Sequence, residues 1–237
     1  MHILITGASS GIGLSTAAKL FQSGHQLSLC SRSTDSLNAF NAEKLEGKAF
    51  VGSCDVRDIE SVRAFTKSAV QKHGTIDVLV NNAGLGKFNR LDEAPIEEWH
   101  EMMDTNVKGL LNCIHAVLPG MKEQESGHII NLGSVASHNV FPNSGVYCAS
   151  KHAVLAISEG LRIECSAYLK VTTISPGAVN TNFIYKTENE ELKNQMEASF
   201  VNGMTPEMIA DQIDYVVGYS GKATISEIII RPNKQKS

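Results

Sequence analysis

The stretch TGASSGIG, residues 6–13, follows directly on the short apolar run HILIT, residues 2–6. Its glycines at positions 7, 11 and 13 allow a tight turn that approaches a ligand without a Cβ in the way. From Ile12 to Phe21, apolar and small residues recur at helical spacing. A strand, a glycine-rich turn and a helix in this order predict a pyrophosphate site at the helix N-terminus. A glycine-rich turn without any ligand is the alternative.

The rest of the chain continues to alternate between expected strands and helices. Further strands are expected at residues 26–31, 49–56, 76–84, 128–134, 170–177 and 225–232, and further helices at residues 34–46, 59–73, 95–118, 144–168 and 205–220. Pro95 suits the first turn of its helix, and Pro119 with Gly120 is expected to end that helix. The alternation predicts an α/β fold over residues 1–237: a single doubly wound Rossmann domain, an about seven-stranded parallel sheet with helices on both faces.

Composition argues against several classes of protein. Hydrophobic residues make up 42% of the 237 residues, and the net charge of −4 disfavours nucleic acid or an anionic membrane as the main partner. No apolar run approaches the roughly 20 residues that span a bilayer, and the N-terminal MHILITG has no export signal. The five cysteines lack CxxC spacing, and the eight histidines form no recognisable ligand set. We expect a cytoplasmic protein with reduced thiols and no metal.

The end of the second expected strand, LCSRS at residues 29–33, bears on the choice of dinucleotide. A free ribose 2′-hydroxyl is usually held there by a carboxylate, but Ser31 and Arg32 occupy these positions. A guanidinium and small hydroxyls suit a 2′-phosphate. Asp35, the nearest acid, falls in the first turn of the next helix, where the helix dipole accounts for it. The sequence therefore favours NADP over NAD.

The stretch YCASK, residues 147–151, places Tyr147 and Lys151 about one helical turn apart on one face. A surface tyrosine that covers a lysine stem is one interpretation, and a proton donor tuned by a cation is the other. Proton exchange near neutral pH requires the pKa of tyrosine to fall by about three units, or ~4 kcal/mol. One cation ~4 Å away supplies about that much. The pair is therefore a candidate acid/base.

Several stretches together carry a resemblance to one family. They are TGASSGIG (6–13), CDV (54–56), NNAG (81–84), TN (105–106), GS (133–134), YCASK (147–151) and SPGAVNT (175–181). In this order, from about Ile3 to Thr181, they resemble the short-chain dehydrogenase/reductase family. The resemblance implies an oxidoreductase that transfers a hydride between NADP(H) and a secondary alcohol or carbonyl compound.

The resemblance also implies roles for single residues. Tyr147 would be the general acid/base, and Lys151 would bind the nicotinamide ribose and lower the pKa of Tyr147. Ser134 would hold the substrate oxygen, and Asn106 would organise a water that links Lys151 to solvent. The implied cofactor-binding residues are Gly7, Ser9, Ser10, Gly11, Ile12, Gly13, Ser31, Arg32, Asp55, Val56, Asn82, Ala83, Gly84, Tyr147, Lys151, Pro176, Gly177, Val179 and Thr181.

Substrate specificity is expected in residues 182–203, a predicted lid over the pocket. The lid is expected to use Phe183, Ile184, Tyr185, Met196 and Phe200, although a solvated surface helix is the alternative for its acidic part. The ending ISEIIIRPNKQ, residues 225–235, resembles that of NADP-dependent 3-hydroxy acid (serine-type) dehydrogenases, which implies a small 3-hydroxy acid as substrate. The candidate partners of its carboxylate are Lys87, Lys186, His138 and Asn143.

Two alternative functions remain at this point. One is a broad-specificity NADPH carbonyl reductase, and the other is a regulator that binds NADP without catalysis. The presence of Asn106, Ser134, Tyr147 and Lys151 favours an enzyme, because a regulator needs the glycine turn but no proton donor. The resemblance further implies a homodimer or homotetramer that pairs through the helices at about 96–118 and 145–168.

Overall fold

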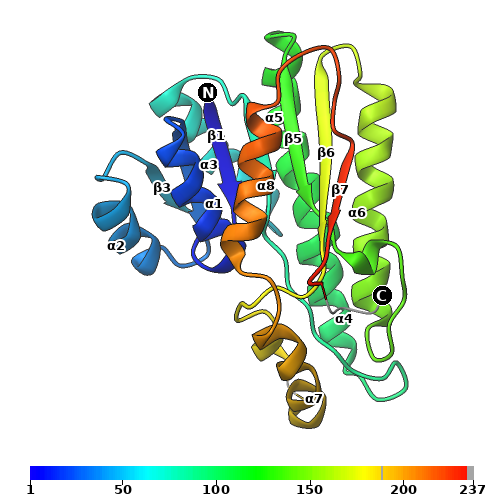
Figure 1. Ribbon diagram of the computed structural model, residues 1–237. Coiled ribbons are helices and arrows are strands. Elements are labelled where there is room, and N and C mark those ends of the chain that lie inside the picture. Colours follow the sequence, from blue (N-terminus) through cyan, green and yellow to red (C-terminus); the bar gives the residue numbers. More distant parts are fainter. Residues whose placement is uncertain (188, 234–237) are drawn as a thin grey trace.

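A parallel sheet runs through the centre of the protein, as the computed structural model shows for residues 1–187 and 189–233 (Figure 1). Its strands are β1 (His2–Thr6), β2 (Gln26–Ser31), β3 (Phe50–Ser53), β4 (Val78–Asn81), β5 (Gly127–Leu132), β6 (Leu169–Pro176) and β7 (Glu227–Ile230). The described residues form seven strands in the order β3-β2-β1-β4-β5-β6-β7, and each neighbouring pair is parallel. The order reverses direction beside β1, which creates a crevice at the carboxyl ends of β1 and β4.

Helices cover both faces of this sheet. One face is covered by α1 (Gly11–Gln22), α2 (Asp35–Lys44) and α8 (Pro206–Gly218), and the other by α3 (Ile59–His73), α5 (Gly109–Glu123) and α6 (Gly145–Glu164). Because successive strand residues point to opposite faces, Ile3 and Ile5 enter the first core and Leu4 enters the second. The predicted doubly wound α/β domain is therefore confirmed.

The helix expected between residues 95 and 118 is built differently. Pro95 lies just before α4 (Ile96–Met103), a π-helical turn (Asp104–Lys108) follows, and α5 then runs through Pro119 to Glu123. The expectation that Pro119 ends the helix is wrong. A proline removes one hydrogen bond, but Val117 and Met121 on either side of it are buried in the core, and their packing holds the last turn.

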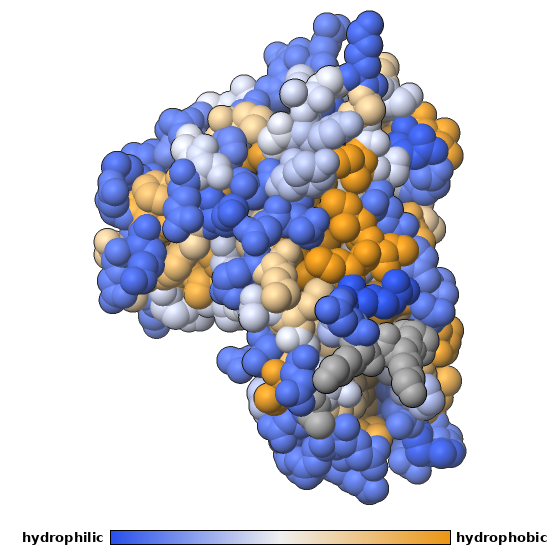
Figure 2. All heavy atoms as spheres, in the orientation of Figure 1, coloured by the Kyte–Doolittle hydropathy of each residue, from blue (hydrophilic) through white to orange (hydrophobic). Residues whose placement is uncertain are grey.

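Two short helical segments lie beyond the carboxyl ends of the strands. A short 3₁₀ turn (Ile184–Lys186) and α7 (Glu190–Val201) project from the carboxyl edge of the sheet, below the other helices in Figure 1. The edge strand β7 carries exposed apolar surface, including Ile229, and Figure 2 shows apolar side chains gathered in this area.

All five cysteines lie in the described part and have free thiols. Among the described residues, no helix has both the length and the apolar character needed to cross a membrane.

Candidate active site

The glycine turn between β1 and α1 is shaped by its own backbone. Gly7 has a φ of 62°, and a Cβ there would lie 2.8 Å from the Cα of Ala83. A Cβ on Gly13 would lie 2.4 Å from Asn82 Nδ2 and 2.5 Å from the carbonyl oxygen of Gly7. Asn82 Nδ2 donates to the carbonyl oxygens of Thr6 and Gly7, at 2.9 and 3.0 Å. Side chains at these glycines would therefore break the contact between the turn and the loop after β4.

A cavity of about 1030 Å³ opens at this turn. Ser10 is the N-cap of α1 but makes no side-chain capping bond, and residues 9–12 line the cavity. The free N–H groups and the positive dipole end of α1 thus face the cavity, as binding of a diphosphate requires. The volume lies at the upper end of ordinary ligand pockets, so the cavity is large enough for a dinucleotide beside a second molecule. The residues present therefore fit a nicotinamide dinucleotide.

Nearly all the predicted cofactor-binding residues share this cavity. The predicted cofactor-binding residues that line it are Gly7, Ser9, Ser10, Gly11, Ile12, Ser31, Arg32, Asp55, Val56, Asn82, Ala83, Gly84, Tyr147, Lys151, Pro176, Gly177, Val179 and Thr181. Gly13 does not line it, because its hydrogen atoms face Asn82 and the turn itself. Its part is to bring α1 close to the loop after β4.

The cavity wall beyond β2 and β3 carries Arg32, Asp55 and Arg57. Arg32 is exposed and makes no ion pair with any described residue. The Ser31 hydroxyl donates to the carbonyl oxygen of Ser33, so its proton is already engaged. Arg57, which the sequence did not single out, donates to Asp55 through Nε at 3.0 Å and Nη2 at 2.6 Å. These bonds hold the pKa of Asp55 below its usual value.

Tyr147 and Lys151 lie one turn apart on α6 and both line the cavity. Lys151 is only 7% exposed, and its Nζ donates to the carbonyl oxygen of Leu132 at 2.7 Å. Burial lowers the pKa of Lys151 to about 8. Burial also raises the pKa of Tyr147 to about 12, although a hydrogen bond with Ser134 acts in the opposite direction. The expected lowering of this pKa is therefore not found in the chain by itself, because desolvation outweighs the neighbouring groups.

Ser134 and Asn106 stand behind the cavity rather than on its wall. The Ser134 hydroxyl accepts from the backbone N–H of Ala136 at 3.1 Å and donates to the carbonyl oxygen of Pro176 at 3.4 Å. It thereby caps the short 3₁₀ helix Val135–Ser137 and joins β5 to the end of β6. Its hydrogen bond with Tyr147 brings it to the candidate acid/base.

Asn106 lies at the centre of the π-helical turn and is buried. Its Oδ1 accepts from the backbone N–H of Leu85 at 2.8 Å, and its Nδ2 donates to the Leu85 carbonyl oxygen at 2.8 Å and to Ser150 Oγ at 3.0 Å. A Cβ on Gly84 would lie 3.3 Å from Asn106 Oδ1 and 3.8 Å from Lys151 Nζ, so these two side chains meet at Gly84. Both atoms of the Asn106 amide therefore bond to the backbone of Leu85. The backbone that it binds belongs to the loop after β4.

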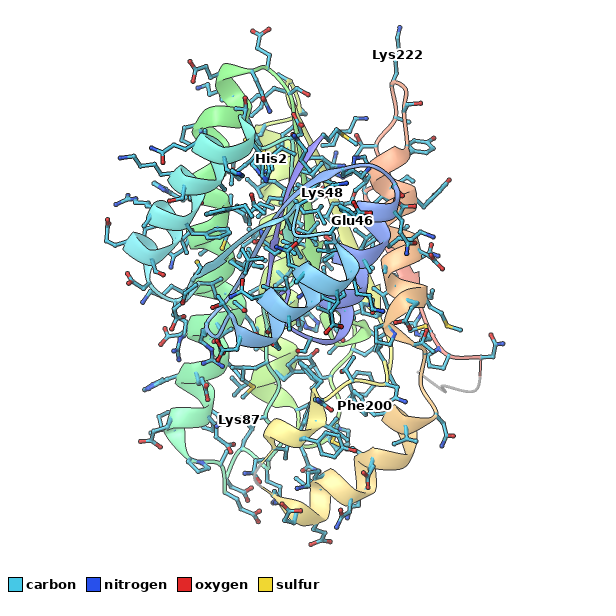
Figure 3. All side chains as sticks on the ribbon, turned by 90° about the vertical axis from the view of Figure 1, so that its left-hand side faces the viewer. His2, Glu46, Lys48, Lys87, Phe200 and Lys222 are labelled. Carbon is cyan, nitrogen blue, oxygen red and sulfur yellow. The ribbon has the colours of Figure 1, made fainter. Side chains whose placement is uncertain are left out.

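Aromatic rings surround the Tyr147 side of the cavity. The ring of Tyr147 has centroid distances of 5.4 Å to Phe88 and 5.6 Å to Phe183, both edge-to-face. Phe183 in turn stacks on Phe200 at 6.5 Å. Phe88, Phe183 and Phe200 all line the cavity, and Figure 3 shows Phe200 on the side of α7 that faces the rest of the protein. Phe88 was not expected from the sequence, because nothing there indicates how its loop folds.

The lid residues expected from the sequence divide into two groups. Phe183, Met196 and Phe200 line the cavity. Tyr185 does not: it is 49% exposed, and its hydroxyl donates to Glu197 at 2.8 Å. Ile184 is buried and is also absent from the cavity wall.

The expected partners of a substrate carboxylate do not gather at the cavity. Lys87 pairs with Glu101 at 3.1 Å, His138 pairs with Glu227 at 2.7 Å, and neither lines the cavity. Asn143 lines the cavity but carries no charge. The Lys186 side chain lies outside the described part. The described charged residues on the cavity wall are Arg32, Asp55, Arg57 and Lys151.

Known proteins are similar to this chain both in sequence and in fold. Residues 1–192 match the family model described as short chain dehydrogenase. An uncharacterized oxidoreductase of Staphylococcus saprophyticus is 41% identical over 98% of this chain and 96% of its own length. An alcohol dehydrogenase from the archaeon Thermococcus sibiricus, complexed with 5-hydroxy-NADP, is 30% identical with a TM-score of 0.88 over 100% of this chain and 98% of its own. The closed form of serine dehydrogenase, complexed with NADP⁺, is 31% identical with a TM-score of 0.93 over 100% and 97%.

Proposed function

This chain belongs to the short-chain dehydrogenase/reductase family, and from that premise we propose that it is an NADP(H)-dependent oxidoreductase acting on secondary alcohols and carbonyl compounds. One observation carries the proposal. Tyr147 and Lys151 line the same cavity as the glycine turn and the N-terminus of α1. A dinucleotide and a proton donor can therefore act on one substrate bound between them.

Each group of residues would have its own role in cofactor binding or proton transfer. The glycine turn, Asn82 to Gly84 and residues 176–181 would hold the cofactor, which when bound supplies or accepts the hydride. Tyr147 would give its hydroxyl proton to the carbonyl oxygen during reduction and take a proton from the alcohol during oxidation. Lys151, held by the carbonyl oxygen of Leu132, would place a positive charge beside the phenolate that remains. Ser134 and Asn106 would position these two side chains.

The preference for NADP over NAD rests on Arg32. Its guanidinium is exposed on the cavity wall, and no described carboxylate pairs with it. The other arginine of this wall, Arg57, already donates to Asp55 through both Nε and Nη2. A ribose 2′-phosphate would therefore find an available guanidinium at Arg32, whereas NAD would find no free carboxylate beside it.

Substitution of Tyr147 by Phe tests the proposed chemistry. The variant keeps the ring and its packing against Phe88 and Phe183 but loses the proton. We expect kcat for any carbonyl compound that the wild type reduces to fall by about 10²–10⁴-fold. The affinity for NADPH, measured by fluorescence titration, should stay the same. A variant with wild-type turnover would remove Tyr147 from the mechanism.

A small 3-hydroxy acid is a second candidate substrate. The likeness to serine dehydrogenase, with a TM-score of 0.93, favours it. Oxidation of serine, 3-hydroxybutyrate or 3-hydroxyisobutyrate with NADP⁺, followed at about 340 nm, would support this substrate class. The nucleotide-binding regulator is less well supported, because it would not use the Tyr147–Lys151 pair.

We also propose that residues 182–203 act as a lid and that the chain forms a homo-oligomer. Asn189 Nδ2 donates to Asn89 Oδ1 at 3.1 Å, which joins this segment to the loop after β4.

Leu111 on α5 and Ile163 on α6 are exposed apolar side chains that suit pairing through these helices. Light scattering would test the oligomer. The free thiols are consistent with a reducing compartment such as the cytoplasm.

A further inference from the structure

Aromatic side chains from separate segments of the chain form the part of the cleft around Tyr147. We infer that this part selects neutral carbonyl compounds with a bulky apolar or aromatic substituent, and that Phe88, Phe183 and Phe200 are the residues that select them. The inference rests on the proposed oxidoreductase function and adds the class of substrate to it.

The three phenylalanines come together from distant positions in the chain. Phe88 lies in the loop after β4, Phe183 follows β6, and Phe200 is on α7. Phe88 and Phe183 contact each other at a centroid distance of 6.2 Å, and each meets the Tyr147 ring edge-to-face. A substrate whose carbonyl oxygen reaches the Tyr147 hydroxyl must therefore place its substituents against these rings. Ring faces and edges of this kind bind apolar and aromatic groups best.

The face that α7 turns toward the cavity has the same character. The lining residues of α7 are Leu192, Gln195, Met196, Ser199 and Phe200. They recur at the i, i+3, i+4, i+7 and i+8 spacing of one helical face, so α7 presents this face along its length. The charged residues of the helix do not line the cavity: Glu190 and Glu191 are exposed, and the half-buried Lys193 pairs with Glu190. Glu197 accepts from the Tyr185 hydroxyl. The cavity face of α7 is thus apolar or neutral.

The charged residues of the cavity wall are not part of the phenylalanine cluster. Arg32, Asp55 and Arg57 follow β2 and β3, which are separated from β5 by β1 and β4 in the sheet. Lys151 lies about one helical turn after Tyr147 on α6, where it is buried and its Nζ donates to the carbonyl oxygen of Leu132. Within the described residues, no cation on the cavity wall lies among the phenylalanines. A substrate carboxylate bound there would lose its water without gaining a cationic partner, which disfavours it strongly.

A matched pair of ketones tests the inference. Methyl 4-acetylbenzoate and 4-acetylbenzoate have the same ring and the same reacting carbonyl, but only the second carries a carboxylate. With saturating NADPH, we expect kcat/KM for the ester to exceed that for the acid by about 100-fold. Ethyl acetoacetate and acetoacetate form a second pair without an aromatic ring. Equal rates, or a preference for the acids, would overturn the inference and leave the proposed oxidoreductase function intact.

Variants of the rings identify the residues responsible. Phe183→Ala and Phe200→Ala should lower kcat/KM for the aromatic ester about tenfold more than kcat/KM for acetone, mainly through KM. Tyr185→Ala is the matched control: Tyr185 is an aromatic residue of the same segment, but it is exposed and does not line the cavity. Equal losses in Tyr185→Ala, or equal losses for acetone, would contradict a selecting role for the rings.

A gained cation tests the charge argument directly. Ser199 lies on the cavity face of α7, one position before Phe200. Ser199→Arg should raise kcat/KM for 4-acetylbenzoate at least about tenfold relative to the ester, because the carboxylate then has a partner. An unchanged ratio would contradict the charge argument. Should no ketone be reduced at all, the proposed function fails, and calorimetry with NADP⁺-saturated protein still decides the inference: tighter binding of the ester supports it, and tighter or equal binding of the acid overturns it.

Discussion

The two ends of the cleft differ in what lines them: mainly backbone at the cofactor end and mainly side chains at the substrate end. At the cofactor end, a glycine turn, the N-terminus of α1 and the amide of Asn82 form the wall, and a Cβ on Gly13 would come within 2.5 Å of the backbone. At the substrate end, side chains from three distant segments meet around Tyr147. The first end is set by backbone geometry and tolerates few changes. The second is set by side-chain identity, so it can change its ligand without changing the fold.

Lys151 lies where the two ends meet, and its replacement should give the largest effect. In the folded chain its pKa is lowered from 10.5 to about 8. Below pH 8 the Lys151 ammonium is charged in both states, but it is buried in the folded chain and hydrated in the unfolded chain. Its burial lowers the free energy of unfolding by about 3 kcal/mol. We expect Lys151→Met to lose turnover and to raise the free energy of unfolding at pH 7 by up to about that amount.

The same substitution has a pH signature. Between the folded and the usual pKa of Lys151 the unfolded chain binds more protons, so the wild type regains stability as pH rises. The difference between Lys151→Met and wild type should therefore shrink from about pH 8 to pH 10.5 in urea titrations. A variant that is less stable than wild type at pH 7, or a difference that does not vary with pH, would contradict the stated burial cost.

Gly13→Ala tests whether the cofactor end is as rigid as its geometry indicates. The new Cβ would lie 2.4 Å from Asn82 Nδ2, so the turn and the loop after β4 must separate. We expect the free energy of unfolding to fall by about 2 kcal/mol and the affinity for NADPH to fall with it. Gly160→Ala on α6 is the control, because its Cβ meets no atom within 4 Å. That variant should gain about 0.5–1 kcal/mol in thermal or urea unfolding.

Arg32→Ala sharpens the contrast at the outer wall of the cofactor end. Removal of this guanidinium should raise KM for NADPH at least about tenfold and leave KM for NADH nearly unchanged. Arg57→Ala should have a smaller effect on the ratio, because Arg57 already binds Asp55. Equal losses for both cofactors in Arg32→Ala would show that the residue does not recognise the 2′-phosphate.

Asn189→Ala should give the smallest effect, and it concerns the substrate end alone. Its side chain bonds to Asn89 at 3.1 Å, and the backbone N–H of Asn89 donates to the carbonyl oxygen of Asn143 at 2.8 Å. The substitution also removes the cap of α7, because Asn189 Oδ1 accepts from the backbone N–H of Leu192 at 3.1 Å. Loss of these two bonds should raise KM for the ketone two- to fivefold, about 0.5–1 kcal/mol, with the affinity for NADPH unchanged. A parallel loss of NADPH affinity would show that the two ends are coupled through this segment.

The comparison also explains what could be predicted from the sequence. The glycine turn, the strands and the Tyr147–Lys151 spacing depend on local patterns, and the fold that they predicted is correct. The course of the chain through Pro119 was not predictable, because the packing of Val117 and Met121 overrides the proline. The π-helical turn that aims Asn106 at the loop after β4 likewise has no local signal.

The substrate end was partly within reach of the sequence. Met196 and Phe200 line the cavity, and their helical spacing with Leu192 could have indicated one cavity face. The position of Phe88 depends on the course of residues 85–94, which form no regular helix or strand. The pKa of Tyr147 could not be predicted from its distance to Lys151 either, because burial of both groups decides it.

The most direct test of the account is the consumption of NADPH by the purified chain. Loss of absorbance at about 340 nm would be followed with neutral ketones, and the alcohol formed would be quantified by chromatography. We predict one alcohol formed for each NADPH consumed, faster with NADPH than with NADH. Tight binding of NADPH, without consumption by any ketone or keto acid and without reduction of NADP⁺ by any alcohol or hydroxy acid, would contradict the account and identify a nucleotide-binding regulator.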